Sequence, residues 1–274
     1  RSALIASIVI GFSWIVSTAK NEAVFFFMAN KEGQYVAELG GNMTHLAGDL
    51  EAASQFLKGE EFWAAYASAQ EVVEDSFQPS GTDYIIHVLG DEQRETYMSR
   101  FREGDFKYAA TIRKDYTDFE YWIERANWFF YRELYKDWHP VFSNAYEIYW
   151  ERNDSGEEHM VSDDFEVQIV EINDSTVKLI IQTDENLNGV ADIYIDYSVE
   201  KKQGSRSAKL LLQSVLKVQN TGTVRASDAG YESNYLRQEN AEYIPMHITN
   251  GYGELTLTAC PDRSVFLNLK EVRC

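Results

Sequence analysis

Residues 184–192 place oxygen-bearing side chains at alternate positions of one short loop. The pattern is Asp-x-Asn-x-Asn-Gly-x-x-Asp, and it lies between two strand-like runs. Calcium takes about six to eight oxygen ligands, and alternate positions of a tight loop supply them. The candidate ligands are four side chains and one backbone carbonyl, from Asp184, Asn186, Asn188, Val190 (the carbonyl) and Asp192.

The same residues also fit a plain hairpin turn. Asn188-Gly189 is a common two-residue turn between antiparallel strands, and Ile195 stands where an EF-hand places its bidentate glutamate. Calcium binding and a simple turn therefore both remain open.

No part of the sequence has the residue spacing of a catalytic centre. The five histidines are dispersed, and there is no glycine-rich phosphate loop, nucleophile elbow or His-Glu-x-x-His run. We predict that the chain is not an enzyme.

Composition and net charge further limit the kind of protein and the partners that we expect. Of the 274 residues, 45% are hydrophobic and 14% aromatic, which favours a folded protein. The net charge is −19, from 44 acidic and 25 basic residues, and this disfavours nucleic acid as a partner.

The N-terminal region is predicted to form one long helix. Residues 3–19 carry no charge, and residues 23–29 are again apolar, so residues 3–29 could span a bilayer or pack against other helices. We expect this segment to be retained rather than removed as a secretory signal. An amphipathic seam with helical spacing follows, at Val36, Leu39, Met43, Leu46, Leu50, Ala53 and Leu57.

The middle of the chain is predicted to be helical and rich in aromatic residues. A capping box at residues 117–120 opens a helix that ends near Trp138. One face of this helix is expected in the core. Its second face is a candidate glycan- or partner-binding surface, with core packing as the alternative, and it carries Tyr121, Trp128, Tyr131 and Tyr135.

From about residue 146 onward the sequence favours an antiparallel sheet. Short runs alternate between apolar and polar residues, as at Val177, Leu179 and Ile181, and turn-rich connections join them. The predicted fold class is α+β. The predicted division is an N-terminal helix over 1–58, an aromatic helical region over 59–145 and a β region over 146–274.

The two cysteines, Cys260 and Cys274, lie near the end of the chain. Thiols pair in exported proteins, and the apolar N-terminus suggests export, so we predict a disulfide between them.

This layout resembles the type IV pilin superfamily, in which a hydrophobic N-terminus continues into a long amphipathic helix followed by an antiparallel sheet. Residues 41–57 and 184–198 are similar to pieces of minor pilins, and the C-terminal cysteine pair is similar to the one that bounds a loop in many pilins. Most pilins carry glutamate at the fifth position of the mature chain, where Ile5 stands here. This favours a minor subunit.

The resemblance implies a structural subunit of an extracellular filament or pseudopilus at the cell surface, held in the cytoplasmic membrane before assembly. Its partners would be copies of itself or other pilin-like subunits. The candidate packing residues are Leu4, Ile5, Ile8, Gly11, Trp14, Lys20 and Glu22. The alternative function is a single-pass, membrane-anchored sensor or a ligand- or glycan-binding domain, including an adhesin.

Overall fold

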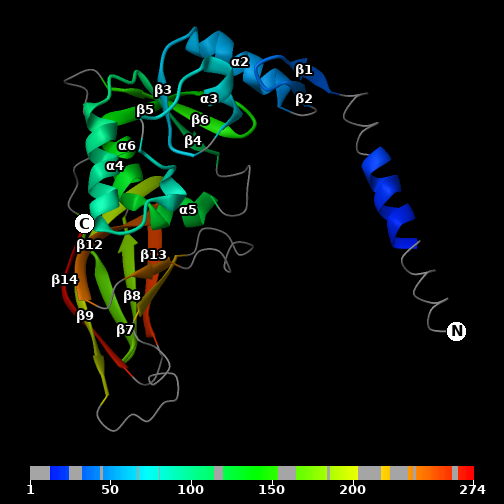
Figure 1. The fold of residues 1–274 in the computed structure, drawn as a ribbon. Helices are drawn as coiled ribbons and strands as arrows, with labels where there is room; N and C mark the ends of the chain where they lie inside the picture. The colour runs from blue at the N-terminus through cyan, green and yellow to red at the C-terminus, as the bar shows by residue number, and fades with distance from the viewer. Residues whose placement is uncertain are drawn as a thin grey trace, which may run out of the picture.

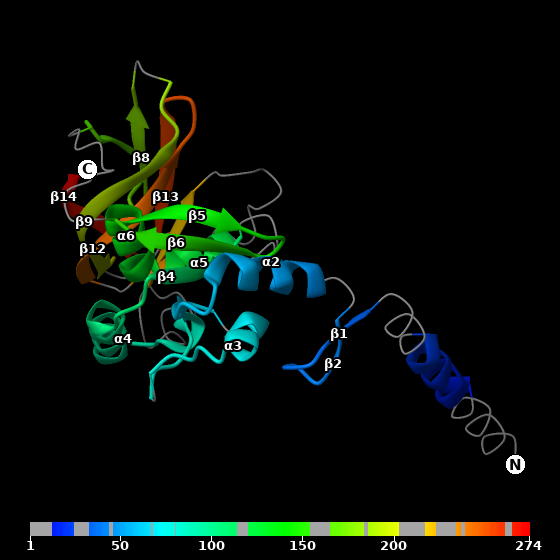
Figure 2. The ribbon, with the colours of Figure 1, turned by 90° about the horizontal axis from the view of Figure 1, so that it is seen from above.

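A computed structural model gives the fold (Figure 1). The structure describes residues 13–24, 33–43, 46–66, 68–79, 81–113, 120–153, 165–183, 186–202, 217–222, 234–236, 239–260 and 265–274. Within them the chain forms two packed units, which we call the mixed unit (residues 46–153) and the β-sandwich (residues 165–274). A helix over residues 13–24, the N-terminal helix, stands away from both units in the two views (Figures 1 and 2).

The mixed unit is built on a four-stranded sheet in the order β3-β4-β6-β5. The β3–β4 pair is parallel, and the other two pairs are antiparallel. The central strand β4 is buried at every residue, because helices cover both faces of the sheet. The strands are β3 (Phe62–Ala64), β4 (Tyr108–Ile112), β5 (Trp138–Ser143) and β6 (Glu147–Arg152).

Two hydrophobic clusters hold these helices on the sheet. Phe62 and Tyr108 face α2, whereas the neighbouring Trp63 and Ala109 face α4 and α6. This alternation follows from the two-residue period of a strand. The helices are α2 (Ala47–Leu57), α3 (Ala69–Glu74), η1 (Ile85–His87), α4 (Asp91–Glu103), α5 (Glu120–Ala126) and α6 (Trp128–Asp137).

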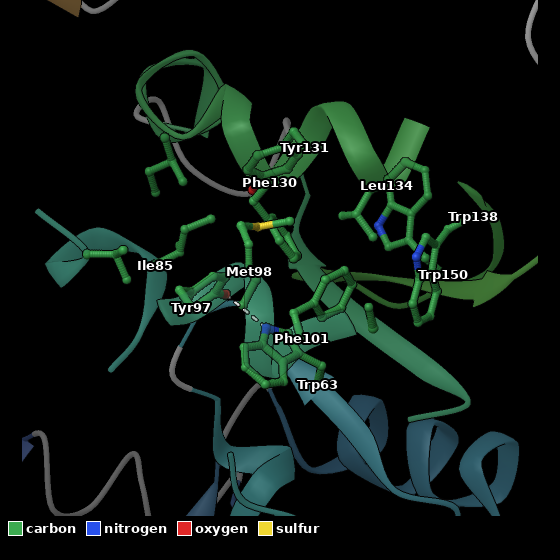
Figure 3. Close-up of a cluster of buried hydrophobic side chains, with 14 of the residues drawn as sticks. Trp63, Ile85, Tyr97, Met98, Phe101, Phe130, Tyr131, Leu134, Trp138 and Trp150 are labelled. Atoms are coloured by element: carbon green, nitrogen blue, oxygen red, sulfur yellow. Dashed lines mark hydrogen bonds between the residues drawn. The ribbon is translucent and has the colours of Figure 1, made fainter. Parts of the chain in front are cut away.

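Aromatic side chains fill the larger cluster (Figure 3). The Trp63 indole Nε1–H donates to the Tyr97 hydroxyl at 2.8 Å, and the Trp63 ring meets the Tyr97 ring edge-on at 5.1 Å. Phe101 of α4 packs on Phe130 of α6 with ring centroids 4.9 Å apart. These contacts fix the position of α6 on the sheet.

The β-sandwich consists of two antiparallel sheets. Within the described residues their strand orders are β11-β10-β13-β8-β7 and β12-β9-β14. The strands are β7 (Gln168–Asn173), β8 (Thr176–Gln182), β9 (Gly189–Lys201), β10 (Lys217–Gly222), β11 (Asn234–Leu236), β12 (Glu239–Ile248), β13 (Tyr252–Cys260) and β14 (Val265–Arg273). Alternate residues of β8 and β9 face each other in the core, among them Leu179, Ile193 and Tyr197.

The predicted α+β, pilin-like fold is wrong. The structure is mostly β, with 42% strand in four sheets and short helices. In place of one long helix to residue 57, a hairpin of β1 (Gln34–Val36) and β2 (Gly41–Met43) separates the N-terminal helix from α2. Gly40 has a φ of 63°, a left-handed conformation that ends a helix and suits a turn. The helical spacing of Val36 and Met43 was therefore coincidental.

The predicted membrane span over residues 3–29 is also corrected. Only residues 13–24 of it are described, and they form a helix. In the part of the chain that the structure describes, no helix combines the length and the hydrophobicity that a bilayer crossing needs.

The predicted aromatic helical region, residues 59–145, contributes β3, β4 and β5 to the same sheet as the strand that follows it, β6. Strand β6 begins at Glu147 and pairs with both β4 and β5, so residues 147–152 belong to the mixed unit. The connection between the two units therefore lies between β6 and β7.

Two buried carboxyl groups lie where α3 meets the sheet. Burial raises the pKa of Glu147 to about 7, although its Oε2 accepts a hydrogen bond of 2.7 Å from the Tyr149 hydroxyl. Burial also raises the pKa of Glu71, which accepts a hydrogen bond from the Ser68 backbone N–H at 3.1 Å. The negative charge of Glu71 further raises the pKa of Glu147.

We predict that Glu147 makes the mixed unit less stable as the pH rises from about 4.5 to above about 7. The pKa of Glu147 rises from 4.5 to about 7 on folding, so between these values the folded state binds more protons than the unfolded state. The free energy of unfolding therefore falls as the pH rises through this window, by on the order of 3 kcal/mol. Glu147→Gln should flatten the fall, as measured by urea unfolding at about pH 5 and about pH 8.

The matched control is Glu151→Gln, which changes a more exposed carboxylate on the same strand. It should leave the pH dependence as in the original protein. If the free energy of unfolding fell equally steeply with pH in the original protein and in Glu147→Gln, the prediction that Glu147 causes the fall would be contradicted.

Candidate functional site

The junction between α6 and the β-sandwich brings together residues from the two sites predicted from the sequence. Trp128 and Arg132 lie one helical turn apart on α6, so their side chains share a face. Asp192 lies near the start of β9, between Ala191 and Ile193, which point into the sandwich core. Its own side chain therefore points outward, toward α6.

Both carboxylate oxygens of Asp192 accept a hydrogen bond from α6. The Trp128 indole Nε1–H donates to Oδ1 at 2.8 Å. The Arg132 guanidinium donates to Oδ2 at 2.5 Å through Nε, and this contact is also an ion pair. Hydrogen bonds to a charged group are stronger than neutral ones, particularly where water is partly excluded. We call these three residues the clamp.

A row of stacked side chains extends the clamp across the outer face of the three-stranded sheet. Tyr243, Tyr194 and Arg273 are aligned on β12, β9 and β14. The Arg132 guanidinium lies 3.7 Å from the centre of the Tyr243 ring, and the Tyr243 and Tyr194 ring centres are 5.2 Å apart. The Arg273 guanidinium lies 4.3 Å from the Tyr194 ring at the other end. Each cation–π contact contributes about 0.5–1 kcal/mol at such partly exposed positions.

A second polar contact crosses the junction nearby. His247 Nε2 of β12 lies 3.3 Å from Oε1 of Glu124 on α5, and the Glu124 side chain is almost fully buried. The clamp and this pair together connect α5 and α6 to the same sheet.

This arrangement is suited to holding two units together. Each guanidinium of the row faces a carboxylate, Arg132 at Asp192 and Arg273 at Glu271, with Nε–oxygen distances of 2.5 and 3.1 Å. Opposite charges therefore cancel locally, and an anionic ligand gains no net attraction.

The predicted calcium loop is tied to the β12–β13 turn. Asn188 Oδ1 accepts a hydrogen bond from the Asn250 N–H at 3.0 Å, and the Leu187 carbonyl accepts one from the Gly251 N–H at 2.8 Å. Val190 packs against the aromatic cluster, and Asn186 is exposed.

Asp184 lies outside the described residues. Among those that are described, no group of three or more His, Cys, Asp or Glu side chains is placed to hold a metal ion. Nothing described therefore supports the expected calcium site, and calcium binding by the loop stays a prediction.

The predicted partner surface lies in the interior. Trp128 and Tyr131 are buried, and Tyr135 is half-buried between the rings of Trp128 and Trp150, at 5.7 and 5.5 Å. The Tyr121 side chain lies outside the described part of the structure. An exposed aromatic face for glycans is therefore not formed by these three described side chains.

The remaining predicted residues are only partly described. Trp14, Lys20 and Glu22 lie on the exposed N-terminal helix, whereas Leu4, Ile5, Ile8 and Gly11 fall outside the described residues. The described side chains contain no disulfide, and the predicted bond between Cys260 and Cys274 stays a prediction. The Cys260 side chain is not among them, so its distance from Cys274 is not defined.

Sequence reasoning missed Arg132, Tyr243, Tyr194 and Arg273. The spacing of Trp128 and Arg132 marks a shared helical face, but it does not identify a partner 60 residues further along the chain.

Comparison with known protein families finds no family model that matches this chain, and no curated protein matches it either.

We predict that Asp192 and Arg132 are energetically coupled. Asp192→Asn should lower the free energy of unfolding by about 1–2 kcal/mol, since a hydrogen bond to a charged group is lost. In a double-mutant cycle with Arg132→Gln, measured by urea unfolding, the coupling energy should be about 1 kcal/mol. The control pair is Lys270 and Asp196, 3.5 Å apart and more exposed, which should couple by less than ~0.5 kcal/mol.

Calcium distinguishes the clamp from the predicted metal site. If Asp192 acts in the clamp, Asp192→Asn should lower the melting temperature equally with about 2 mM calcium and with chelator. A loss of stability that appears only when calcium is present would instead support the metal site and contradict the clamp.

Proposed function

We propose that this chain is a structural subunit that assembles with further copies of itself through the N-terminal helix. The proposal rests on one observation: every residue of that helix, 13–24, is exposed. Trp14 and Ile15 expose 73% and 60% of their surface. Contiguous exposed apolar surface of this kind marks an interaction site.

The helix requires a partner for physical reasons. Most of the stability of a helix in a folded protein comes from packing one of its faces against another element. The described helix has no packing contact with either unit, since all its side chains face solvent. Ser13, Ser17 and Ala19 are small residues, which allow another helix to approach closely.

Charge favours the same helix of a second copy as that partner. The whole chain carries a net charge of −19, so two copies repel each other through their folded units. The helix carries only Lys20 and Glu22, which balance each other within one copy and can pair between copies. Association through the helices thus brings together the neutral parts of two acidic molecules.

A filament of such copies is the extended form of this proposal, and the resemblance described above motivates it. In the described residues the hairpin of β1 and β2 interrupts the helix expected to run to residue 57, so the filament would be built from the helix over residues 13–24 joined to the two units. A ligand- or glycan-binding function has less support, because the aromatic residues proposed for it are buried or half-buried where they are described.

Sedimentation velocity of the full chain over a range of concentrations tests the proposal. We expect reversible oligomers of the 31.5 kDa chain, and Ile15→Glu combined with Val16→Glu should give monomer. Leu89→Glu is the matched control, since Leu89 is 73% exposed on the mixed unit. It should still form oligomers.

Near-ultraviolet circular dichroism should show that all of these variants keep the original fold. A monomer at every concentration, or oligomers that survive the helix substitutions, would contradict the proposal.

A further inference from the structure

Helix α3 is held on the mixed unit by polar side chains. Its buried residues are Gln70 and Glu71, whereas Val72 exposes 42% of its surface and Val73 is half-buried. None of the six residues of α3, all of which are described, belongs to the hydrophobic clusters that hold the other helices on the sheet. A helix in a folded protein is normally stabilised by the packing of an apolar face. The attachment of α3 therefore depends on hydrogen bonds and on the charge of Glu71.

Hydrogen bonds attach α3 to α2 and to the sheet. The Gln70 side-chain amide donates to the Ser54 hydroxyl oxygen and to Glu74 Oε1, each at 2.9 Å. The Ser54 hydroxyl donates to the same Glu74 oxygen. Just beyond the helix, the Phe62 backbone N–H donates to the Ser76 hydroxyl oxygen at 3.2 Å. These contacts position α3 without fully burying an apolar side chain of the helix.

Two carboxyl groups are enclosed where α3 meets the sheet. Glu71 and Glu147 expose 2% and 4% of their surface. Among the described residues, no lysine or arginine contributes to the pKa shift of either group. The Arg113 guanidinium, beyond the end of β4, donates to the Asn144 carbonyl at 2.9 Å. The other titratable groups around the pair are phenols and a third carboxyl group, namely Tyr84, Tyr97, Tyr146, Tyr149 and Glu74.

The two carboxyl groups link the docking of α3 to pH. Burial raises the pKa of both, that of Glu147 to about 7, and the charge of Glu71 raises the pKa of Glu147 further. In water the pKa of Glu71 returns toward 4.5, so docked α3 binds more protons near neutral pH than released α3 does. The free energy of opening α3 therefore falls as the pH rises through this range. Two ionised carboxylates in one buried site also repel each other.

We propose that α3 is a pH-sensitive cover, which stays docked while Glu71 and Glu147 hold protons and opens when both carboxyl groups are ionised. Opening hydrates Glu71 and moves it away from Glu147. The rest of the mixed unit keeps its fold, because its hydrophobic clusters do not include α3. This local opening is distinct from the loss of overall stability predicted above and from assembly through the N-terminal helix.

Native-state hydrogen exchange of the full chain tests the proposal at about pH 6 and about pH 8, in increasing low concentrations of urea. The protection of amides in residues 73–76, corrected for the intrinsic exchange rate, should fall at least about tenfold from pH 6 to pH 8. At pH 8 these amides should open at a lower free energy than those of β4. Their opening should also depend less on urea, because a local opening exposes little surface.

Variants of the full chain locate the effect. Glu71→Gln combined with Glu147→Gln should keep the protection of residues 73–76 within about twofold between the two pH values, because neither group can then ionise. The matched control is Asp75→Asn, which removes an exposed carboxylate at the C-terminal end of the same helix. Asparagine tolerates the left-handed φ of 51° at this position, so this variant should show the same fall as the original protein.

Three results would overturn the proposal. The first is equal protection of residues 73–76 at both pH values in the original protein. The second is exchange of these amides at pH 8 with the free energy and urea dependence of β4, because α3 would then open only when the whole unit unfolds. The third is a fall that persists in the folded double variant. If the double variant does not fold, the pH and urea series on the original protein still decides between docking and opening.

Discussion

The contact of Asp192 with Trp128 and Arg132 makes the two units of this protein one body. Asp192 belongs to β9 and its donors belong to α6, so the two hydrogen bonds join the β-sandwich to the mixed unit. The row of Arg132, Tyr243, Tyr194 and Arg273 spreads this connection across the outer face of the three-stranded sheet. Beside the clamp, the contact of His247 with Glu124 also connects the two units among the described residues.

The clamp depends in turn on the aromatic core of the mixed unit (Figure 3). Trp63 and Tyr97 are hydrogen-bonded, and Phe101 packs on Phe130, which places α6 on its sheet. Trp128 and Arg132, which flank Phe130 on α6, then face the sandwich. The abundance of aromatic residues in this region is therefore explained by packing, and it positions a junction rather than an open binding surface.

The sequence predicted local patterns better than long-range contacts. Alternation at Val177, Leu179 and Ile181 predicted the strand that the structure places in β8, because each strand residue reports directly on one face of a sheet. The predicted seam was misleading from Val36 to Met43, because helical spacing also arises by chance and Gly40 allows a turn. Its later residues Leu50, Ala53 and Leu57 do form the buried face of a helix, α2. The clamp could not be predicted, since a loop rich in Asp and Asn equally suits a metal, a turn or a distant arginine.

Native-state hydrogen exchange at increasing low concentrations of denaturant tests most directly whether the clamp makes one cooperative body. Amides of α6 and of the facing strands β9 and β12 report on the two sides of the junction. The account predicts that the most protected amides on both sides open with one free energy and one denaturant dependence. If the amides of α6 exchanged at a clearly lower free energy of opening while those of β9 and β12 stayed protected, the two units would open independently. That result would contradict the claim that the clamp makes them one cooperative body.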